Sequence, residues 1–80
     1  MVRAGDWRLA AGEYGKLARL PDLWTPALYA AVCWELAGER GRADSLMRDA
    51  IVRSRMPADS VRALALGLRG SFVWKAAAPR

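Results

Sequence analysis

Proline and glycine residues at regular intervals divide this chain into four stretches, each of a length typical of a short helix. Pro21, Pro26 and Pro57 cannot lie inside a helix without breaking its hydrogen bonds, and Gly38 and Gly70 are typical residues at helix ends. We therefore expect helices over residues 7–19, 26–37 and 42–55, and a fourth that ends near residue 69.

Residues that cap helix N-termini stand before three of these stretches. The expected caps are Asp6, Thr25, and either Asp59 or Ser60. The final segment, 71–80, contains Phe72 and Trp74 and either extends the fourth helix or forms a free tail.

Apolar residues recur at the three-to-four spacing of a buried helix face. In the third stretch they are Ala43, Leu46, Met47, Ala50 and Ile51, and in the fourth Val61, Leu64, Ala65 and Leu68. The second stretch is apolar almost all round, so we expect it to be the central helix. No stretch alternates polar and apolar residues as a strand does, so the fold class is all-α. Short connections predict antiparallel αα-hairpins, which either stack as a small solenoid or close into a four-helix bundle.

The length and composition predict one small globular domain spanning residues 1–80, with its core over about 6–70. Of the 80 residues, 54% are hydrophobic and 26% charged, which is incompatible with a disordered acidic or proline-rich segment. No apolar run is long enough for a transmembrane helix, and the first residues do not resemble a signal peptide. We therefore expect a cytoplasmic protein that does not interact with membranes.

The residue inventory argues against an enzyme. The chain has no histidine and one cysteine, Cys33, which excludes zinc fingers, Ser-His-Asp triads and internal disulfides. The turn between Gly38 and Gly41 lacks the Lys-Ser/Thr pair of a phosphate-binding loop. We expect no catalytic residues, no metal site and no cofactor, and a core position for Cys33.

The chain resembles itself at an offset of 34 residues. Ala27, Ala31 and Trp34 recur in type as Val61, Ala65 and Leu68. Within 26–59, a small residue and a large aromatic in one helix are followed by a small, large, small series and a proline: Ala31, Trp34, Ala43, Met47, Ala50 and Pro57. This pattern resembles the tetratricopeptide repeat (TPR), a helix-turn-helix unit, although Ala27 stands where a Trp or Leu is usual.

The resemblance implies a scaffold that binds an amphipathic helix of a partner protein in the concave face formed by successive A helices. Carried onto this sequence, the partner-binding positions are Thr25, Leu28, Val32, Glu35, Leu36, Arg62, Leu66 and Arg69. The segments Trp24-Thr25-Pro26 and Cys33-Trp34-Glu35-Leu36 also resemble the TPR-type chaperones of type III secretion needle subunits. That resemblance implies an adaptor or chaperone that holds a helix of a secretion substrate.

Two of these expectations have alternatives. The stripe Leu28, Val32 and Leu36 either lines the groove or belongs to the core under Phe72 and Trp74. The first helix presents Trp7 and Tyr14, which suggests a second interface and hence a homodimer or an obligate hetero-complex. Alternatively, the first helix folds back and closes a bundle.

The charge distribution supports a different function as the main alternative. The net charge of +5 arises entirely from residues 39–80, and most of the basic residues are arginines. A small DNA- or RNA-binding protein would use such residues to contact phosphates, and the candidates are Arg48, Arg53, Arg55 and Arg62. The basic residues are mixed with acidic ones, which is typical of a solvated helix surface.

Overall fold

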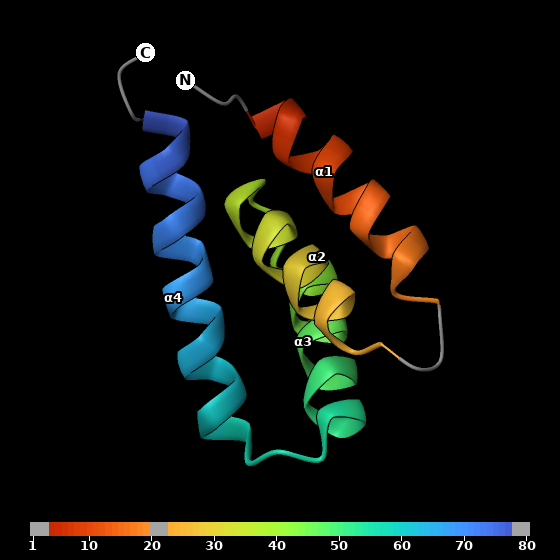
Figure 1. Ribbon diagram of the computed structural model, residues 1–80. Coiled ribbons are helices and arrows are strands. Elements are labelled where there is room, and N and C mark those ends of the chain that lie inside the picture. The colour runs from red at the N-terminus through yellow and green to blue at the C-terminus, as the bar shows by residue number, and fades with distance from the viewer. Residues whose placement is uncertain (1–3, 20–22, 78–80) are drawn as a thin grey trace.

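The computed structural model describes residues 4–19 and 23–77, and within them the chain forms four helices (Figure 1). These are α1 (Ala4–Leu17), α2 (Thr25–Leu36), α3 (Arg40–Ser54) and α4 (Ala58–Ala77). The predicted all-α class and hairpin-like contacts between consecutive helices are confirmed. The expected helix end before Gly70 is wrong, because α4 continues through this residue to Ala77. The predicted extension is therefore confirmed for 71–77, and residues 78–80 lie outside the described part.

Two of the expected caps differ in detail. Asp6 lies in the first turn of α1 rather than before it. Trp24 occupies the N-cap position of α2, so Thr25 is already helical and makes no capping hydrogen bond with its side chain. Asp59 likewise lies in the first turn of α4. Acidic side chains there still favour the positive end of the helix dipole.

The end of α2 is formed by a glycine in a left-handed conformation. Gly38 has φ +87°, and its amide donates to the carbonyl oxygen of Glu35 at 3.0 Å. The amide of Glu39 donates to the carbonyl oxygen of Trp34 at 2.9 Å. This pair of hydrogen bonds is the Schellman arrangement, which turns the chain sharply into α3.

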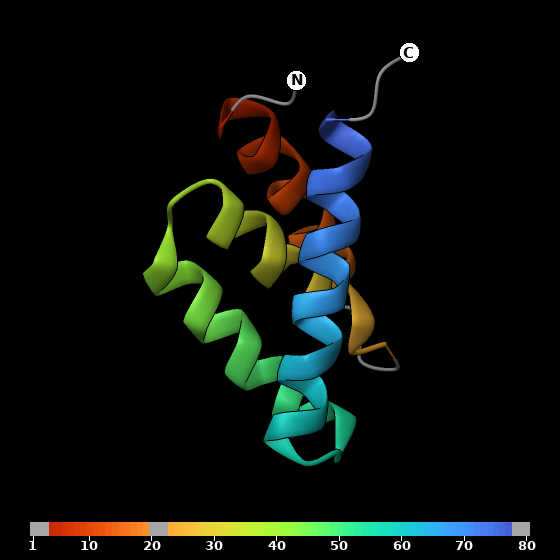
Figure 2. The same cartoon turned by 90° about the vertical axis from the view of Figure 1, so that its left-hand side faces the viewer.

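The central helix is α2, as its apolar composition predicts. It packs against α1, α3 and α4 (Figures 1 and 2). Its buried residues are Pro26, Ala27, Leu28, Ala30, Ala31, Val32 and Cys33. Alanines on the faces toward neighbouring helices allow close approach, and Val61 and Ala65 of α4 complete the buried cluster with Ala50 of α3.

Four aromatic side chains join the first helix to the last across α2. The ring of Trp7 stacks on Phe72 with centroids 6.0 Å apart, and Tyr29 meets Phe72 and Tyr14 edge-on at 6.2 and 5.3 Å. Trp7 and Tyr14 are half-buried. The expectation that these two residues stand uncovered is therefore wrong, because α1 folds back onto the domain as in the alternative.

Polar contacts also hold the helices to one another. Arg8 of α1 pairs with Glu39 at 2.6 Å, and the guanidinium of Arg42 lies 4.7 Å from the ring centroid of Trp34. Within the described residues, no helix is long and apolar enough to span a bilayer.

Candidate protein-interaction site

The apolar stripe predicted to line the groove is part of the core. Val32 is fully buried and Leu28 is 3% exposed, and Leu36 is half-buried and packs against the same cluster. Val61, Ala65, Leu68 and Phe72 of α4 belong to this cluster or pack on it. Leu28, Val32 and Leu36 therefore do not form an open stripe for a partner helix. Trp74, expected as part of the cover, is 71% exposed.

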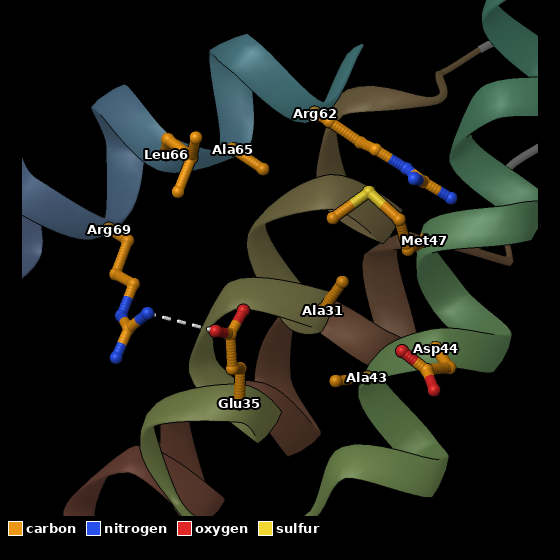
Figure 3. Close-up of a pocket in the computed structure, with 9 residues that line it drawn as sticks. All are labelled: Ala31, Glu35, Ala43, Asp44, Met47, Arg62, Ala65, Leu66 and Arg69. Atoms are coloured by element: carbon orange, nitrogen blue, oxygen red, sulfur yellow. Dashed lines mark hydrogen bonds and ion pairs between the residues drawn. The ribbon is translucent and has the colours of Figure 1, made fainter. Parts of the chain in front are cut away.

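The remaining predicted positions on α2 and α4 come together around one pocket. Its volume is about 420 Å³, and it lies between α2, α3 and α4 (Figure 3). Its lining residues are Ala31, Glu35, Ala43, Asp44, Met47, Arg62, Ala65, Leu66 and Arg69. The lining thus includes Glu35, Arg62, Leu66 and Arg69, which the resemblance assigns to partner binding. We call this hollow the interhelical pocket.

The inner part of the interhelical pocket is apolar and built from small residues. Ala31, Ala43 and Ala65 come from three different helices, and the flexible side chain of Met47 lies beside them (Figure 3). Larger residues at the alanine positions would fill the hollow. This part can accept apolar side chains without a polar partner.

The rim carries two acidic and two basic residues. Glu35 of α2 accepts a hydrogen bond from Arg69 of α4, with 3.0 Å between Oε1 and Nη1, and both side chains are partly exposed. Arg62 extends from α4 toward α3, on which Asp44 lies (Figure 3). Leu66, on the same rim, is 68% exposed. An apolar interior with both charge signs around it suits an amphipathic surface better than a single small anion.

A second, polar hollow adjoins the interhelical pocket. It has a volume of about 280 Å³ and shares several lining residues with the first, namely Glu35, Ala43, Asp44 and Arg69. Arg40, at the start of α3, adds a third guanidinium. The surface therefore changes from apolar at Met47 and Leu66 to charged at Arg40.

Sequence reasoning missed the contribution of α3 to this site. Ala43 and Met47 were assigned to packing between helices, and Asp44 to the ordinary charged surface. The TPR comparison places partner contacts on A helices alone, so it gave no reason to examine α3. The alternation of Ala43, Asp44 and Met47 on one helix edge is the signal that was present.

An apolar crevice lies on the other side of α4, between it and the first half of α2. It has a volume of about 480 Å³ and is lined by Trp24, Thr25, Leu28, Tyr29, Ala63, Leu64, Gly67 and Leu68. Thr25, predicted for the partner groove, lies here, and Leu28 forms part of the floor. We call it the α2–α4 crevice.

The arginines proposed for phosphate contacts have different environments. Arg48 and Arg55 are exposed on and just after α3, whereas Arg62 belongs to the interhelical pocket. Arg53 donates hydrogen bonds to the backbone carbonyls of Ala18 and Leu23. This use of Arg53 removes it from the exposed basic surface.

Cys33 lies in the core, as its neighbours in the sequence predict. Burial raises the pKa of its thiol to about 11, because the thiolate would lose its hydration. Among the residues that the structure describes, no cluster of His, Cys, Asp or Glu could hold a metal ion.

Comparisons of the chain with models of protein families, with curated proteins and with solved structures found no match. The site must therefore be interpreted from its own geometry, within a small all-helical domain of four helices.

Proposed function

We propose that this chain is a protein-interaction module, an adaptor or chaperone, that binds an amphipathic helical segment of a partner over the interhelical pocket. The observation that carries the proposal is the combination of an apolar interior with a charged rim on three helices. A helix presents apolar anchors at i, i+3, i+4 and i+7 with charged residues beside them, which matches this surface. The proposed module has no catalytic group and needs no cofactor.

The anchoring side chains would enter the hollow beside Ala31, Ala43 and Met47. A pocket of about 420 Å³ holds a few side chains rather than a helix backbone, so the ligand helix would lie over the rim. There Leu66, 68% exposed, would be covered by the ligand. Burial of such a leucine contributes roughly 1.5–3 kcal/mol.

Arginines at the rim indicate acidic residues on the ligand. Arg62 and Arg69 lie two helical turns apart on α4, and Arg40 extends the basic edge. Carboxylates of the ligand can accept paired hydrogen bonds from these guanidiniums. Glu35, already bonded to Arg69, holds that guanidinium over the pocket in the free chain.

A finer form of the proposal is a TPR-like chaperone of a type III secretion needle subunit. It rests on the sequence repeat at an offset of 34 residues and on the segment from Trp24 to Leu36. The contact of α2 with α4, the two helices that correspond to successive A helices, supports a TPR-like arrangement. The predicted cytoplasmic location belongs to this form of the proposal.

Peptide binding followed by NMR tests the proposal. The probe is a synthetic peptide with the sequence of the carboxyl-terminal helix of a type III secretion needle subunit, and its control carries Asp at the apolar anchors. We expect the probe to shift amide resonances of Ala43, Met47 and Leu66, and Leu66→Asp to weaken binding about tenfold or more. Leu9→Asp, at a 72% exposed leucine on α1, is the matched control.

Equal affinity of the wild-type chain and Leu66→Asp would place binding elsewhere. Equal affinity for the probe and its Asp control would exclude recognition by apolar anchors. Either result would overturn the assignment of the interhelical pocket.

Nucleic-acid binding through Arg48 and Arg55 remains the alternative proposal, because both side chains are exposed on the basic half of the chain. Phosphate contacts release counterions, so the affinity for a duplex would fall steeply as salt is raised, whereas helix binding in an apolar pocket would change little. Arg48→Gln with Arg55→Gln would then weaken duplex binding and leave peptide binding intact.

A further inference from the structure

The exposed face of α4 has an unusual composition. Ala63, Gly67, Gly70 and Trp74 follow one another at intervals of four, three and four residues, so they lie along one face of the helix. All four are exposed, and Trp74 is 71% exposed. No member carries a charge. This uncharged stripe, which we call the α4 stripe, runs beside the α2–α4 crevice.

Nothing within the described chain explains the two glycines of the stripe. A Cβ atom built on Gly67 or Gly70 meets no heavy atom within 4 Å, and neither residue has a positive φ. Each lowers the helix propensity of α4 relative to alanine. Glycine in an exposed helix face permits close approach of another backbone, which here would have to come from another molecule.

The α2–α4 crevice and Trp74 are complementary in character. The crevice is apolar, has a volume of about 480 Å³ and includes Ala63, Leu64, Gly67 and Leu68 of α4. Trp74 presents a large apolar ring on the same helix, about 12 Å further along the axis at 1.5 Å per residue. A rigid helix prevents the ring from reaching its own crevice.

We propose that α4 pairs with α4 of a second copy of this chain in antiparallel orientation, and that each Trp74 enters the α2–α4 crevice of the other copy. Such a contact is isologous, since the same ring and the same crevice are used twice. The two-fold axis must pass midway between Trp74 and the centre of the crevice. That midpoint falls at Gly70, where the absence of a side chain lets the helices touch.

The charge distribution favours a second copy over a charged partner. A chain with a net charge of +5 repels its own copies unless the contact surface lacks basic residues. Arg62 and Arg69 of α4 line the interhelical pocket on the other side of the helix, away from the α4 stripe. The dimer therefore brings no arginines of the pocket together and leaves the interhelical pocket open, so it is independent of the proposed function.

Sedimentation of the purified full chain over a wide concentration range tests the dimer. We expect the wild-type chain to associate reversibly and Trp74→Ala to raise the dissociation constant about 30-fold. Gly70→Leu should abolish the dimer while raising the melting temperature of the monomer, because leucine has the higher helix propensity and meets no neighbour. Gly12→Leu, at an exposed glycine on α1 that also has open space, is the matched control and should still dimerise.

A cross-linking experiment tests the position of the axis. Gly70→Cys should form a disulfide between two copies when copper phenanthroline and air act as oxidant, because the two thiols face each other across the axis. Leu9→Cys, at an exposed position on α1, should react far more slowly, and the native Cys33 is buried in both variants.

Three results would overturn the proposal. The first is a wild-type chain that stays monomeric, which would leave the crevice to a small apolar ligand or another protein. The second is a dimer that survives Gly70→Leu. The third is equal cross-linking of Gly70→Cys and Leu9→Cys.

Discussion

The guanidinium of Arg53, on α3, donates a hydrogen bond to the carbonyl oxygen of Ala18, just after α1, with 2.7 Å between Nη1 and O. Its other terminal nitrogen donates to the carbonyl oxygen of Leu23 at 2.6 Å. Asp49, one turn earlier on α3, accepts from the same guanidinium at 3.2 Å. One side chain thus fixes both ends of the α1–α2 connection to α3.

Replacing Arg53 with lysine should lower the free energy of unfolding by about 1–3 kcal/mol, because an ammonium group cannot reproduce the fork of donors. The Arg53 side chain is only 22% exposed, so water replaces these hydrogen bonds poorly. Urea denaturation followed by circular dichroism measures the loss. Arg48→Lys, at an exposed position on the same helix, should change stability little. Equal effects of the two substitutions would contradict the structural role of Arg53.

The conformation of Gly38 predicts substitutions of opposite sign at two glycines. Gly38→Ala should cost about 1 kcal/mol, because alanine is strained at φ +87°. Gly12→Ala, inside α1 with open space around the added methyl group, should stabilise by up to about 1 kcal/mol. Thermal unfolding of the two variants beside the wild-type chain gives both signs. A stabilising Gly38→Ala would exclude the left-handed helix end.

The fold is predictable where local signals agree with packing. Pro57 and Gly38 interrupt the chain where the structure does, and the all-round apolar character of α2 indicates its central position. The end of α4 is different, because Gly70 is a weak signal worth only about 1 kcal/mol. Packing of Phe72 against Trp7 and Tyr29 stabilises the helix beyond it, and this long-range contact leaves no local trace in the sequence.

The site is less predictable, because periodicity shows that a helix face is apolar but not what covers it. Leu28 and Val32 have the spacing of a binding stripe, yet α4 buries them. Leu66 and Arg69 were placed correctly at a pocket, since their faces of α4 point away from the core. Which elements complete the pocket depends on the crossing of α3 and α2, a property of the assembled fold.

Burial of Val32 changes what a charged substitution at this position would report. Val32→Asp should abolish cooperative unfolding, because a carboxylate without a partner in the core costs several kcal/mol and a domain of this size has little stability to lose. Leu66→Asp, at a largely exposed leucine, should unfold with nearly the wild-type midpoint. Urea titration monitored by circular dichroism separates the two outcomes. A cooperative Val32→Asp would show that the core is not closed over this residue.

Burial of Cys33 predicts a loss of stability at alkaline pH. Its pKa is raised from 9.0 to about 11 by desolvation, so the unfolded chain releases the thiol proton at a lower pH than the folded chain. Below the unfolded pKa both states keep the proton and the stability is unaffected. Between the two pKa values the unfolded state binds fewer protons, so the free energy of unfolding falls as the pH rises. The loss amounts to roughly 2–3 kcal/mol once the folded pKa is passed.

Comparison with Cys33→Ala isolates this effect, because tyrosines and Lys16 titrate over the same range in both proteins. The free energy of unfolding from urea titrations should decline more steeply with pH for the wild-type chain than for Cys33→Ala. A thiol reagent such as dithionitrobenzoate should also modify native Cys33 slowly near neutral pH and rapidly in urea, since the reactive thiolate forms only when the residue is exposed. Parallel pH profiles of the two proteins would show that the thiol titrates equally in both states.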